Sequence, residues 1–286
     1  MPASDREFYI FGRNISHSLS PALHNAGFRE LGLPYRYSIH ESEEVDQTVE
    51  ELINAPSFGG ASVTFPHKLQ VGRLLSSLSP SAQRIGAVNT IVSTEYNGRK
   101  FLLGDNTDWS GIKACIVKSR VSDYQSSSAL VVGAGGAARA ACYALQTLQV
   151  PEIIVVNRTR SRAVEMAQHF ANTKFRIFES LEELARSGEG DVRLIVACVP
   201  ADDLTEEKIP RSLFSQKGSG VLIEMAYRPL ETGMMKVVKG FPGWEVFRGT
   251  DVLEEQAYAQ FELWTGERAP MSVMREAMQA EVASRL

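Results

Sequence analysis

Residues 129–139, Ala-Leu-Val-Val-Gly-Ala-Gly-Gly-Ala-Ala-Arg, decide the fold of this chain. The apolar run 129–132 predicts a strand, the glycines predict a turn, and the alanine-rich stretch 137–145 predicts a helix. Ile-Ile-Val-Val at 153–156 predicts a second strand. This order is the context in which a dinucleotide fingerprint binds a pyrophosphate at a helix N-terminus. Gly133 would allow the tight turn, Gly135 would let the backbone approach the phosphates, and Ala138 fills the small third position.

The residues after the second expected strand indicate which dinucleotide is bound. An NAD site usually carries an acidic residue there, whereas this chain has Asn157-Arg158, with Arg160 and Arg162 close behind. A carboxylate would repel a 2′-phosphate and a guanidinium binds one bidentately, so the expected cofactor is NADP. The alternative is a tight glycine turn in another α/β protein, with the arginines at a solvated helix start.

Composition and charge exclude several classes of protein. The 286 residues suffice for two domains, and 44% hydrophobic and 22% charged residues are ordinary for a soluble globular protein. With a net charge of −4 and no long basic run, nucleic acid is not an expected partner. No apolar run approaches the roughly 20 residues of a membrane span, and the polar N-terminus lacks a signal-peptide core. The scattered cysteines and histidines predict neither disulfides nor a metal site, and a cytoplasmic location is expected.

Alternating α and β patterns continue on both sides of the glycine turn. Further strands are expected at 7–12, 35–40, 60–65, 194–198 and 220–224, and helices at 21–31, 45–54, after Pro66, and at 109–120, 252–264 and 272–286. Segments 89–93 and 100–104 are expected to pair as a hairpin around Tyr96-Asn97-Gly98. The pattern favours an N-terminal α/β domain and a Rossmann domain, with C-terminal helices that could return to the first.

Polar clusters follow the expected strands of the first half, where open α/β sheets bind ligands. Ser18 and Ser20 alternate in a loop, so both hydroxyls could face one ligand group; alternatively, Ser20 is only the N-cap of a helix with Pro21 at N1. Lys68 is expected at the start of a helix, where the dipole would lower its pKa and suit proton transfer. Its alternative is an ordinary solvent-exposed lysine.

Two further clusters, Gly-Ala-Val-Asn-Thr at 86–90 and Gly-Asp-Asn-Thr-Asp at 104–108, complete the set. Asn89 could bond a ligand hydroxyl or form a turn. Asp108 could cap the helix expected at 109–120, or it could form an acid/base pair with Lys68. The spacing alone does not show that Lys68 and Asp108 meet.

These motifs, in this order, resemble shikimate dehydrogenase. The resemblance rests on Ser-His-Ser-Leu-Ser-Pro (16–21), Val-Thr-Phe-Pro-His-Lys (63–68), the two clusters above, Gly-Ala-Gly-Gly-Ala-Ala-Arg (133–139), Asn-Arg-Thr (157–159) and Gln256 in Gln-Ala-Tyr-Ala-Gln-Phe. Stretches such as Cys-Val-Pro-Ala (198–201) and Trp-Thr-Gly (264–266) look especially like the dehydrogenase domain of the fungal pentafunctional AROM polypeptide. The chain is therefore a free-standing relative or one domain of a multifunctional polypeptide.

The resemblance implies reversible NADP-dependent reduction of 3-dehydroshikimate to shikimate, in the shikimate pathway of aromatic amino acid biosynthesis. It implies that Lys68 and Asp108 form the catalytic pair. The implied substrate-binding residues are Ser18, Ser20, Thr64, Asn89, Tyr227 and Gln256. The implied cofactor-binding residues are Gly133, Ala134, Gly135, Gly136, Ala137, Asn157, Arg158, Thr159, Arg162, Met225 and Gly249.

The expected fold class is therefore α/β with two domains. Residues 1–108 with 250–286 would form a substrate and catalytic domain with a mostly parallel sheet, and 109–249 the Rossmann NADP-binding domain, with the active site in the cleft between them. Three departures from the family pattern affect the cofactor pocket: Glu224 in place of aspartate, Thr232-Gly233 in place of Thr-Pro, and Val252 in place of methionine. The alternatives are a quinate or dual quinate/shikimate dehydrogenase, and a non-catalytic regulator of the quinate pathway.

Overall fold

The glycine-rich turn follows a strand of an all-parallel sheet and leads into a helix. The strand order of this sheet is β12-β11-β10-β7-β8-β9. This order is that of a doubly wound dinucleotide-binding fold, whose ligand crevice lies where the order reverses, between β7 and β10. The computed structural model describes residues 5–96, 98–121, 124–188, 192–214 and 219–285. The chain divides into two units, Met1–Thr107 with Gln256–Leu286 (unit 1) and Asp108–Glu255 (unit 2).

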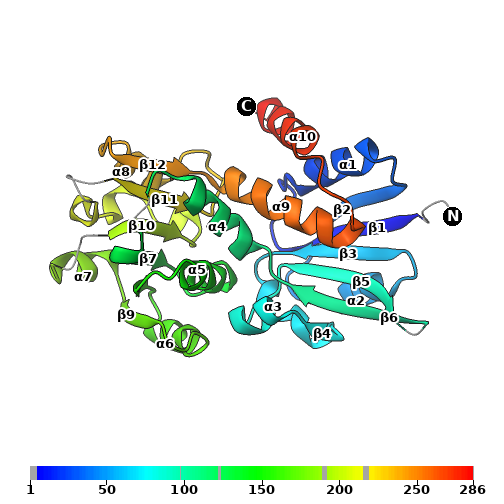
Figure 1. The fold of residues 1–286 in the computed structure, drawn as a ribbon, viewed down its shortest axis with the longest axis horizontal. Helices are drawn as coiled ribbons and strands as arrows, with labels where there is room; N and C mark the ends of the chain where they lie inside the picture. The colour runs from blue at the N-terminus through cyan, green and yellow to red at the C-terminus, as the bar shows by residue number, and fades with distance from the viewer. Residues whose placement is uncertain (1–4, 97, 122–123, 189–191, 215–218, 286) are drawn as a thin grey trace. The chain divides into compact units, whose positions relative to one another are not determined.

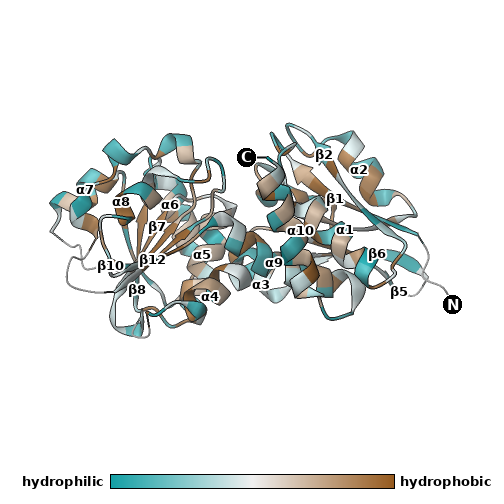
Figure 2. Ribbon diagram, turned by 90° about the horizontal axis from the view of Figure 1, so that it is seen from above, coloured by the Kyte–Doolittle hydropathy of each residue, from teal (hydrophilic) through white to brown (hydrophobic). Residues whose placement is uncertain are grey.

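Unit 2 carries the parallel sheet. Its strands are β7 (Ser128–Val132), β8 (Glu152–Val156), β9 (Lys174–Phe178), β10 (Val192–Ala197), β11 (Gly220–Glu224) and β12 (Trp244–Phe247). Its helices are α4 (Asp108–Lys118), α5 (Gly136–Thr147), α6 (Arg160–Gln168), α7 (Leu181–Arg186) and α8 (Gly233–Val238), with 3₁₀ turns η3 (Tyr124–Ser126), η4 (Ala201–Asp203), η5 (Glu206–Lys208) and η6 (Arg211–Leu213). Helices cover both faces of such a sheet, so its central strands are buried and apolar nearly throughout, as their colour in Figure 2 shows.

Unit 1 contains a mixed sheet with the order β2-β1-β3-β5-β6-β4 (Figure 1). Its strands are β1 (Arg6–Gly12), β2 (Tyr35–Glu41), β3 (Phe58–Val63), β4 (Ser77–Leu78), β5 (Thr90–Tyr96) and β6 (Arg99–Asp105). Its helices are α1 (Ser20–Glu30), α2 (Gln47–Asn54), α3 (Pro80–Ile85) and α10 (Met271–Ser284), with 3₁₀ turns η1 (His67–Leu69) and η2 (Val71–Leu74). Strands β1, β2 and β3 are parallel, whereas β5 runs antiparallel to both β3 and β6. The last long helix, α9 (Gly249–Thr265), contains the boundary between the two units.

The predicted hairpin is present as β5 and β6, although Asn97 lies outside the described residues. Two other expectations for unit 1 differ from the structure, one in its bounds and one in its type. The strand expected at 60–65 ends at Val63, so Thr64 lies in the following turn. The helix expected after Pro66 is a pair of 3₁₀ turns, because the chain closes i to i+3 hydrogen bonds there, from Gln70 N to His67 O and from Leu75 N to Gly72 O.

Candidate active site

The turn after β7 has the geometry that the fingerprint requires. Gly133 has φ +114°, and a Cβ placed on it would lie 3.2 Å from the carbonyl oxygen of Cys198, at the end of the neighbouring strand β10. The Gly133 N–H donates to Val156 O at 2.8 Å, which ties the turn to β8. Any other residue at 133 would be strained, so glycine is required for the turn itself.

Gly135 differs from Gly133, since it has ordinary extended backbone and no described atom lies within 4 Å of a Cβ placed on it. It is the N-cap of α5, and no side chain caps this helix. Residues 134–137 are at least partly exposed, whereas Ala138 is fully buried. The first N–H groups of α5 therefore face open space, as an anion-binding helix N-terminus requires.

The turn after β8 presents cationic side chains to solvent. The Asn157 side-chain amide donates to Thr159 O at 2.8 Å and closes the turn, and Thr159 is the N-cap of α6. Arg158 and Arg162 are exposed, and no ion pair joins either of them to another described residue. The first turn of α6 contains no acidic residue. Unpaired cations at a positive helix end are unfavourable without an anion, so this turn is suited to bind a phosphate.

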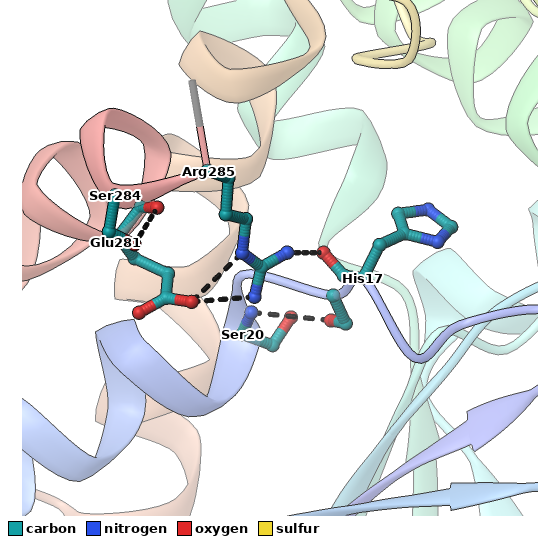
Figure 3. A network of polar contacts seen from close by, with 6 residues as sticks. His17, Ser20, Glu281, Ser284 and Arg285 are labelled. Atoms are coloured by element: carbon teal, nitrogen blue, oxygen red, sulfur yellow. Dashed lines mark hydrogen bonds and ion pairs between the residues drawn. The ribbon is translucent and has the colours of Figure 1, made fainter.

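Ser18 and Ser20 lie at the start of α1, and both are almost fully buried. The backbone N–H of Ser20 donates to Ser18 Oγ at 3.3 Å. The capping interpretation of Ser20 is wrong, because Leu19 is the N-cap residue and no side chain caps the helix. Arg285 donates to the carbonyl oxygen of His17 and pairs with Glu281 at 2.8 Å, which ties this loop to the end of α10 (Figure 3).

Asn89 and Gln256, which are 167 positions apart in the chain, meet in unit 1. Asn89 Nδ2 donates to Gln256 Oε1 at 3.2 Å and to Thr107 Oγ1 at 3.0 Å. Asn89 Oδ1 accepts from the backbone N–H of Thr107 at 2.7 Å, which fixes the orientation of the amide. All three side chains are over nine-tenths buried. The arrangement supports Asn89 as a site residue rather than as an ordinary turn residue.

A second layer of buried polar groups holds this pair in place. Gln260 Nε2 donates to Asn89 O at 3.2 Å and to Thr90 Oγ1 at 2.9 Å, and Gln260 Oε1 accepts from Ser62 Oγ at 2.9 Å. Ser62 Oγ accepts from the Tyr37 hydroxyl at 2.6 Å. Such a connected network of satisfied polar groups fixes the geometry of the groups that it supports.

Lys68 lies on the three-residue turn η1 and is partly buried, and Thr64 precedes it in the turn after β3. The α-helix expected to start at Lys68 is absent there, since the residue lies on a 3₁₀ turn of three residues. Asp108 is buried as the first residue of α4. Lys68 belongs to unit 1 and Asp108 to unit 2, so their pairing stays a prediction.

The loop after β11 carries Met225 and Tyr227 and is fixed by Glu224. Thr232 Oγ1 donates to Glu224 Oε2 at 2.7 Å, and the backbone N–H of Ala226 donates to Glu224 Oε1 at 3.0 Å. Burial raises the pKa of this carboxyl to about 6, although these hydrogen bonds oppose the shift. A Cβ on Gly249 would lie 2.8 Å from Met225 O, so the fold brings two of the expected cofactor residues together.

Comparison with known proteins identifies the family. Residues 10–91 match the family described as the shikimate dehydrogenase substrate binding domain, residues 115–232 match shikimate/quinate 5-dehydrogenase, and residues 249–279 match the shikimate 5′-dehydrogenase C-terminal domain. The solved shikimate 5-dehydrogenase of Thermus thermophilus, in complex with NADP(H) and shikimate, is 32% identical with a TM-score of 0.78; the match covers 96% of this chain and 99% of that one. The chain belongs to the shikimate dehydrogenase family.

Longer relatives of this shikimate dehydrogenase family member are fungal. The pentafunctional AROM polypeptide of Malassezia globosa is 43% identical over 91% of this chain, which spans 16% of that polypeptide. The quinate repressor protein of Emericella nidulans is 36% identical over 94% of this chain, which spans 34% of the repressor. The chain therefore spans about a sixth to a third of these two relatives. The expected likeness to the AROM polypeptide is confirmed, and so is the two-domain α/β fold class.

The family members solved with a bound nucleotide support a nucleotide cofactor for this chain. Within the described ranges, no group of three or more His, Cys, Asp or Glu residues has the arrangement of a metal site. Among the helices that the structure describes, none combines the length and the apolar character that crossing a membrane requires.

Sequence reasoning missed Thr107, Thr90, Ser62 and Gln260 as supports of the site. Gln260 had a usable signal, because it lies four residues after Gln256 and therefore on the same face of one helix. Thr90 and Thr107 lie in the polar clusters at 86–90 and 104–108, but their hydrogen bonds join segments that are distant in sequence. Ser62 offered no local signal, because its contact is with Gln260 on α9.

Proposed function

We propose that this chain catalyses the reversible, NADP-dependent interconversion of shikimate and 3-dehydroshikimate. The observation that carries the proposal is the similarity to the Thermus enzyme, solved with NADP(H) and shikimate, over nearly the whole of both chains. The local geometry supports it in both units. Unit 1 buries an oriented amide pair, Asn89 and Gln256, and unit 2 has a glycine turn and unpaired arginines suited to a phosphorylated dinucleotide.

The proposed substrate contacts follow from the chemistry of the side chains. The hydroxyls of Ser18 and Ser20 would donate to the substrate carboxylate, and Thr64, Asn89 and Gln256 would bond the ring hydroxyls. Tyr227 would contact the same ligand from the loop after β11. Gln256 Oε1 accepts hydrogen bonds from Asn89 and Thr107, which fixes the orientation of its side-chain amide.

The proposed cofactor contacts fit the open turn of unit 2. Gly133, Ala134, Gly135, Gly136 and Ala137 would hold the pyrophosphate, since the residue at 135 leaves room for it. Asn157, Arg158, Thr159 and Arg162 would bind the 2′-phosphate, and Met225 and Gly249 would pack against the nicotinamide. When bound, the nicotinamide supplies or accepts the hydride.

Lys68 and Asp108 would carry the proton transfer. In the direction of reduction, the Lys68 ammonium gives a proton to the oxygen that the hydride addition leaves negative. In the direction of oxidation, the Lys68 amine takes the proton of the hydroxyl group while the hydride leaves its carbon. Asp108 would orient the amine. A proton-transfer group of this kind contributes about 10²–10⁴-fold to the rate.

The test is NADP⁺ reduction, followed at 340 nm, with shikimate and with quinate, and the same assays with NAD⁺. We expect turnover of shikimate with NADP⁺ that falls by about 10²–10⁴-fold in Lys68→Ala. Lys174→Ala is the matched control, since it removes an exposed lysine that pairs with Glu152 and lies outside the proposed site. We expect Arg158→Ala to raise the KM for NADP⁺ about 10–100-fold and to leave NAD⁺ use unchanged, because a charged hydrogen bond is worth about 1.5–3 kcal/mol.

A second candidate is supported by one observation, the similarity to the quinate repressor protein over 94% of this chain. A non-catalytic regulator would bind shikimate or quinate without turnover of either with any nicotinamide dinucleotide. Preference for quinate in the same assay would instead indicate a quinate or dual-specificity dehydrogenase. Two serines at 18 and 20 favour shikimate, and Arg158 argues against an NAD-preferring quinate enzyme.

A further inference from the structure

The residue immediately before Lys68 is a completely buried histidine. His67 has 0% of its surface exposed, and its ring nitrogen Nε2 lies 2.8 Å from Ser42 Oγ, in the loop between β2 and α2. Neither residue belongs to the proposed binding or catalytic groups. The hydrogen bond joins the turn that carries Lys68 to a loop 25 positions earlier in the chain.

Ser42 is itself fixed to the end of strand β1, which pairs with both β2 and β3. Its backbone N–H donates to Gly12 O at 2.9 Å, and the N–H of Thr64 donates to Phe11 O at 2.9 Å. A Cβ on Gly12 would lie 2.4 Å from Thr64 Cγ2, so the two turns pack in direct contact. The His67 ring therefore binds to a part of unit 1 that is rigidly attached to its sheet.

The backbone around Lys68 is held on its other side. The N–H of Val88 donates to Lys68 O at 2.8 Å, and the N–H of His67 donates to Thr64 O at 2.9 Å. A lysine side chain has four rotatable carbons, so the position of its amine depends strongly on how well its Cα is fixed. The His67 ring is the side chain that fixes this backbone from the β1 and β2 side.

The surroundings of the ring favour its neutral form. Nδ1 is buried and has no hydrogen-bond partner among the described residues. If the proton is on Nε2, it is donated to Ser42 Oγ and Nδ1 holds only a lone pair. If the proton were on Nδ1, that N–H would be a buried, unsatisfied donor, and this tautomer would be higher in free energy. Burial lowers the pKa of His67, a shift that His40 reinforces and Asp46 opposes. The ring therefore orients the turn without adding a charge beside the Lys68 ammonium.

We propose that His67 is a positioning residue for Lys68, acting through its hydrogen bond to Ser42. The proposal rests on the proposed function, in which Lys68 transfers the proton. A positioning residue differs from a merely structural buried histidine in its effect. Its substitution changes the rate of the step that Lys68 performs, whereas substitution of a structural histidine changes only stability.

The experiment compares His67→Leu, His67→Gln and Ser42→Ala in the wild-type chain and in Lys68→Ala. Gln is the conservative variant, since its amide nitrogen occupies the place of Nε2 and can still donate to Ser42. We expect His67→Leu to lower kcat for shikimate oxidation about 10–100-fold, as misplacement of a catalytic group by about 1 Å does. The KM for shikimate should change less than about threefold, because the binding groups are untouched. His67→Gln should recover most of the loss, and Ser42→Ala should reproduce part of it.

The Lys68→Ala background gives the decisive comparison. There, His67→Leu should lower the residual rate no further, because the amine that it positions is gone. His24→Phe is the control, a second fully buried histidine of unit 1, and should keep the wild-type kcat. An equal loss of kcat in both backgrounds, or no loss in either, would overturn the proposal. If His67→Leu does not fold, Ser42→Ala decides by the same comparison.

A second readout does not depend on the reaction. Acetylation of Lys68 by acetic anhydride, followed by mass spectrometry across pH, measures the reactivity of its amine directly. We expect the rate at Lys68 to change at least threefold in His67→Leu, with the rate at Lys113 unchanged. A wild-type chain that oxidises neither shikimate nor quinate would refute the proposed function. An unchanged Lys68 reactivity would refute the role of His67, whatever the substrate.

Discussion

Acid should destabilise unit 1 through His24. The ring is completely buried, stacks on Tyr37 with a centroid distance of 4.8 Å, and lies 4.8 Å from the ring of Trp264. Burial lowers the pKa of His24 from 6.5 to about 3, and the nearby Gln260 amide opposes only part of the shift. Between these two values the unfolded chain binds a proton at His24 that the folded unit does not bind. The free energy of unfolding therefore falls as the pH is lowered.

The size of the effect follows from the two pKa values. Stability is complete above pH 6.5, and the loss reaches about 2 kcal/mol at pH 5 and about 3 kcal/mol at pH 4. His24→Phe keeps an aromatic ring among Tyr37 and Trp264 and removes the titration. At pH 7.5 such a volume-conserving replacement should change stability by less than about 1.5 kcal/mol. The difference in free energy of unfolding between His24→Phe and the wild type should therefore shift by about 2 kcal/mol in favour of the variant when the pH is lowered from 7.5 to 5.

Urea unfolding at the two pH values, followed by tryptophan fluorescence, measures this difference. Trp264 contacts His24 and belongs to unit 1, whereas Trp109 and Trp244 belong to unit 2. Replacing Trp109 and Trp244 with phenylalanine, in the wild type and in His24→Phe alike, leaves Trp264 as the source of the fluorescence and so reports on unit 1. His169→Gln, in unit 2, is the control and should leave the unit 1 transition unchanged at both pH values. A difference between His24→Phe and the wild type that is the same at pH 7.5 and pH 5 would refute the reasoning.

Three further predictions concern groups elsewhere in the fold. The pKa of Glu224 is raised to about 6, so its stabilising contribution is complete below pH 4.5 and falls as the pH rises through 6. Between pH 4.5 and 7, the free energy of unfolding of Glu224→Gln, measured by urea titration, should rise by up to about 2 kcal/mol relative to that of the wild type. Gln260→Leu should cost about 3 kcal/mol or more, seen as a lower Tm, because it leaves the buried partners of its amide unsatisfied. Gly133→Ala should lower the Tm through strain at φ +114°, whereas Gly135→Ala should keep the Tm and weaken NADP⁺ binding in calorimetry.

The sequence predicted the central part of unit 2 closely. Strands expected at 129–132 and 153–156 are β7 (Ser128–Val132) and β8 (Glu152–Val156), because a fully buried parallel strand leaves a continuous apolar run. The edge strand β9 (Lys174–Phe178) was not predicted. Lys174 and Arg176 interrupt its apolar residues, and it is only partly buried, so its sequence lacks the continuous apolar run that marks the central strands.

The outcome in unit 1 depended on whether the determining interactions were local. The hairpin was predictable because Asn-Gly favours a tight turn between two strands. β4 (Ser77–Leu78) is two residues long and is defined only by its pairing with β6, which no local pattern encodes. The turn after Pro66 also has a contact that no local pattern encodes, since the His67 ring lies 2.8 Å from Oγ of the distant Ser42.

The candidate site shows why some of its residues are rigidly held and others are not. Neutral amides can be buried at little cost once every polar atom is bonded, so Asn89 and Gln256 are fixed by buried partners. A guanidinium loses far more hydration on burial, so Arg158 and Arg162 remain in solvent. Substitution of the amides should therefore lower both stability and activity. Substitution of the arginines should weaken only the binding of an anion. Measuring both stability and ligand binding for each variant therefore distinguishes residues that support the site from residues that only bind the ligand.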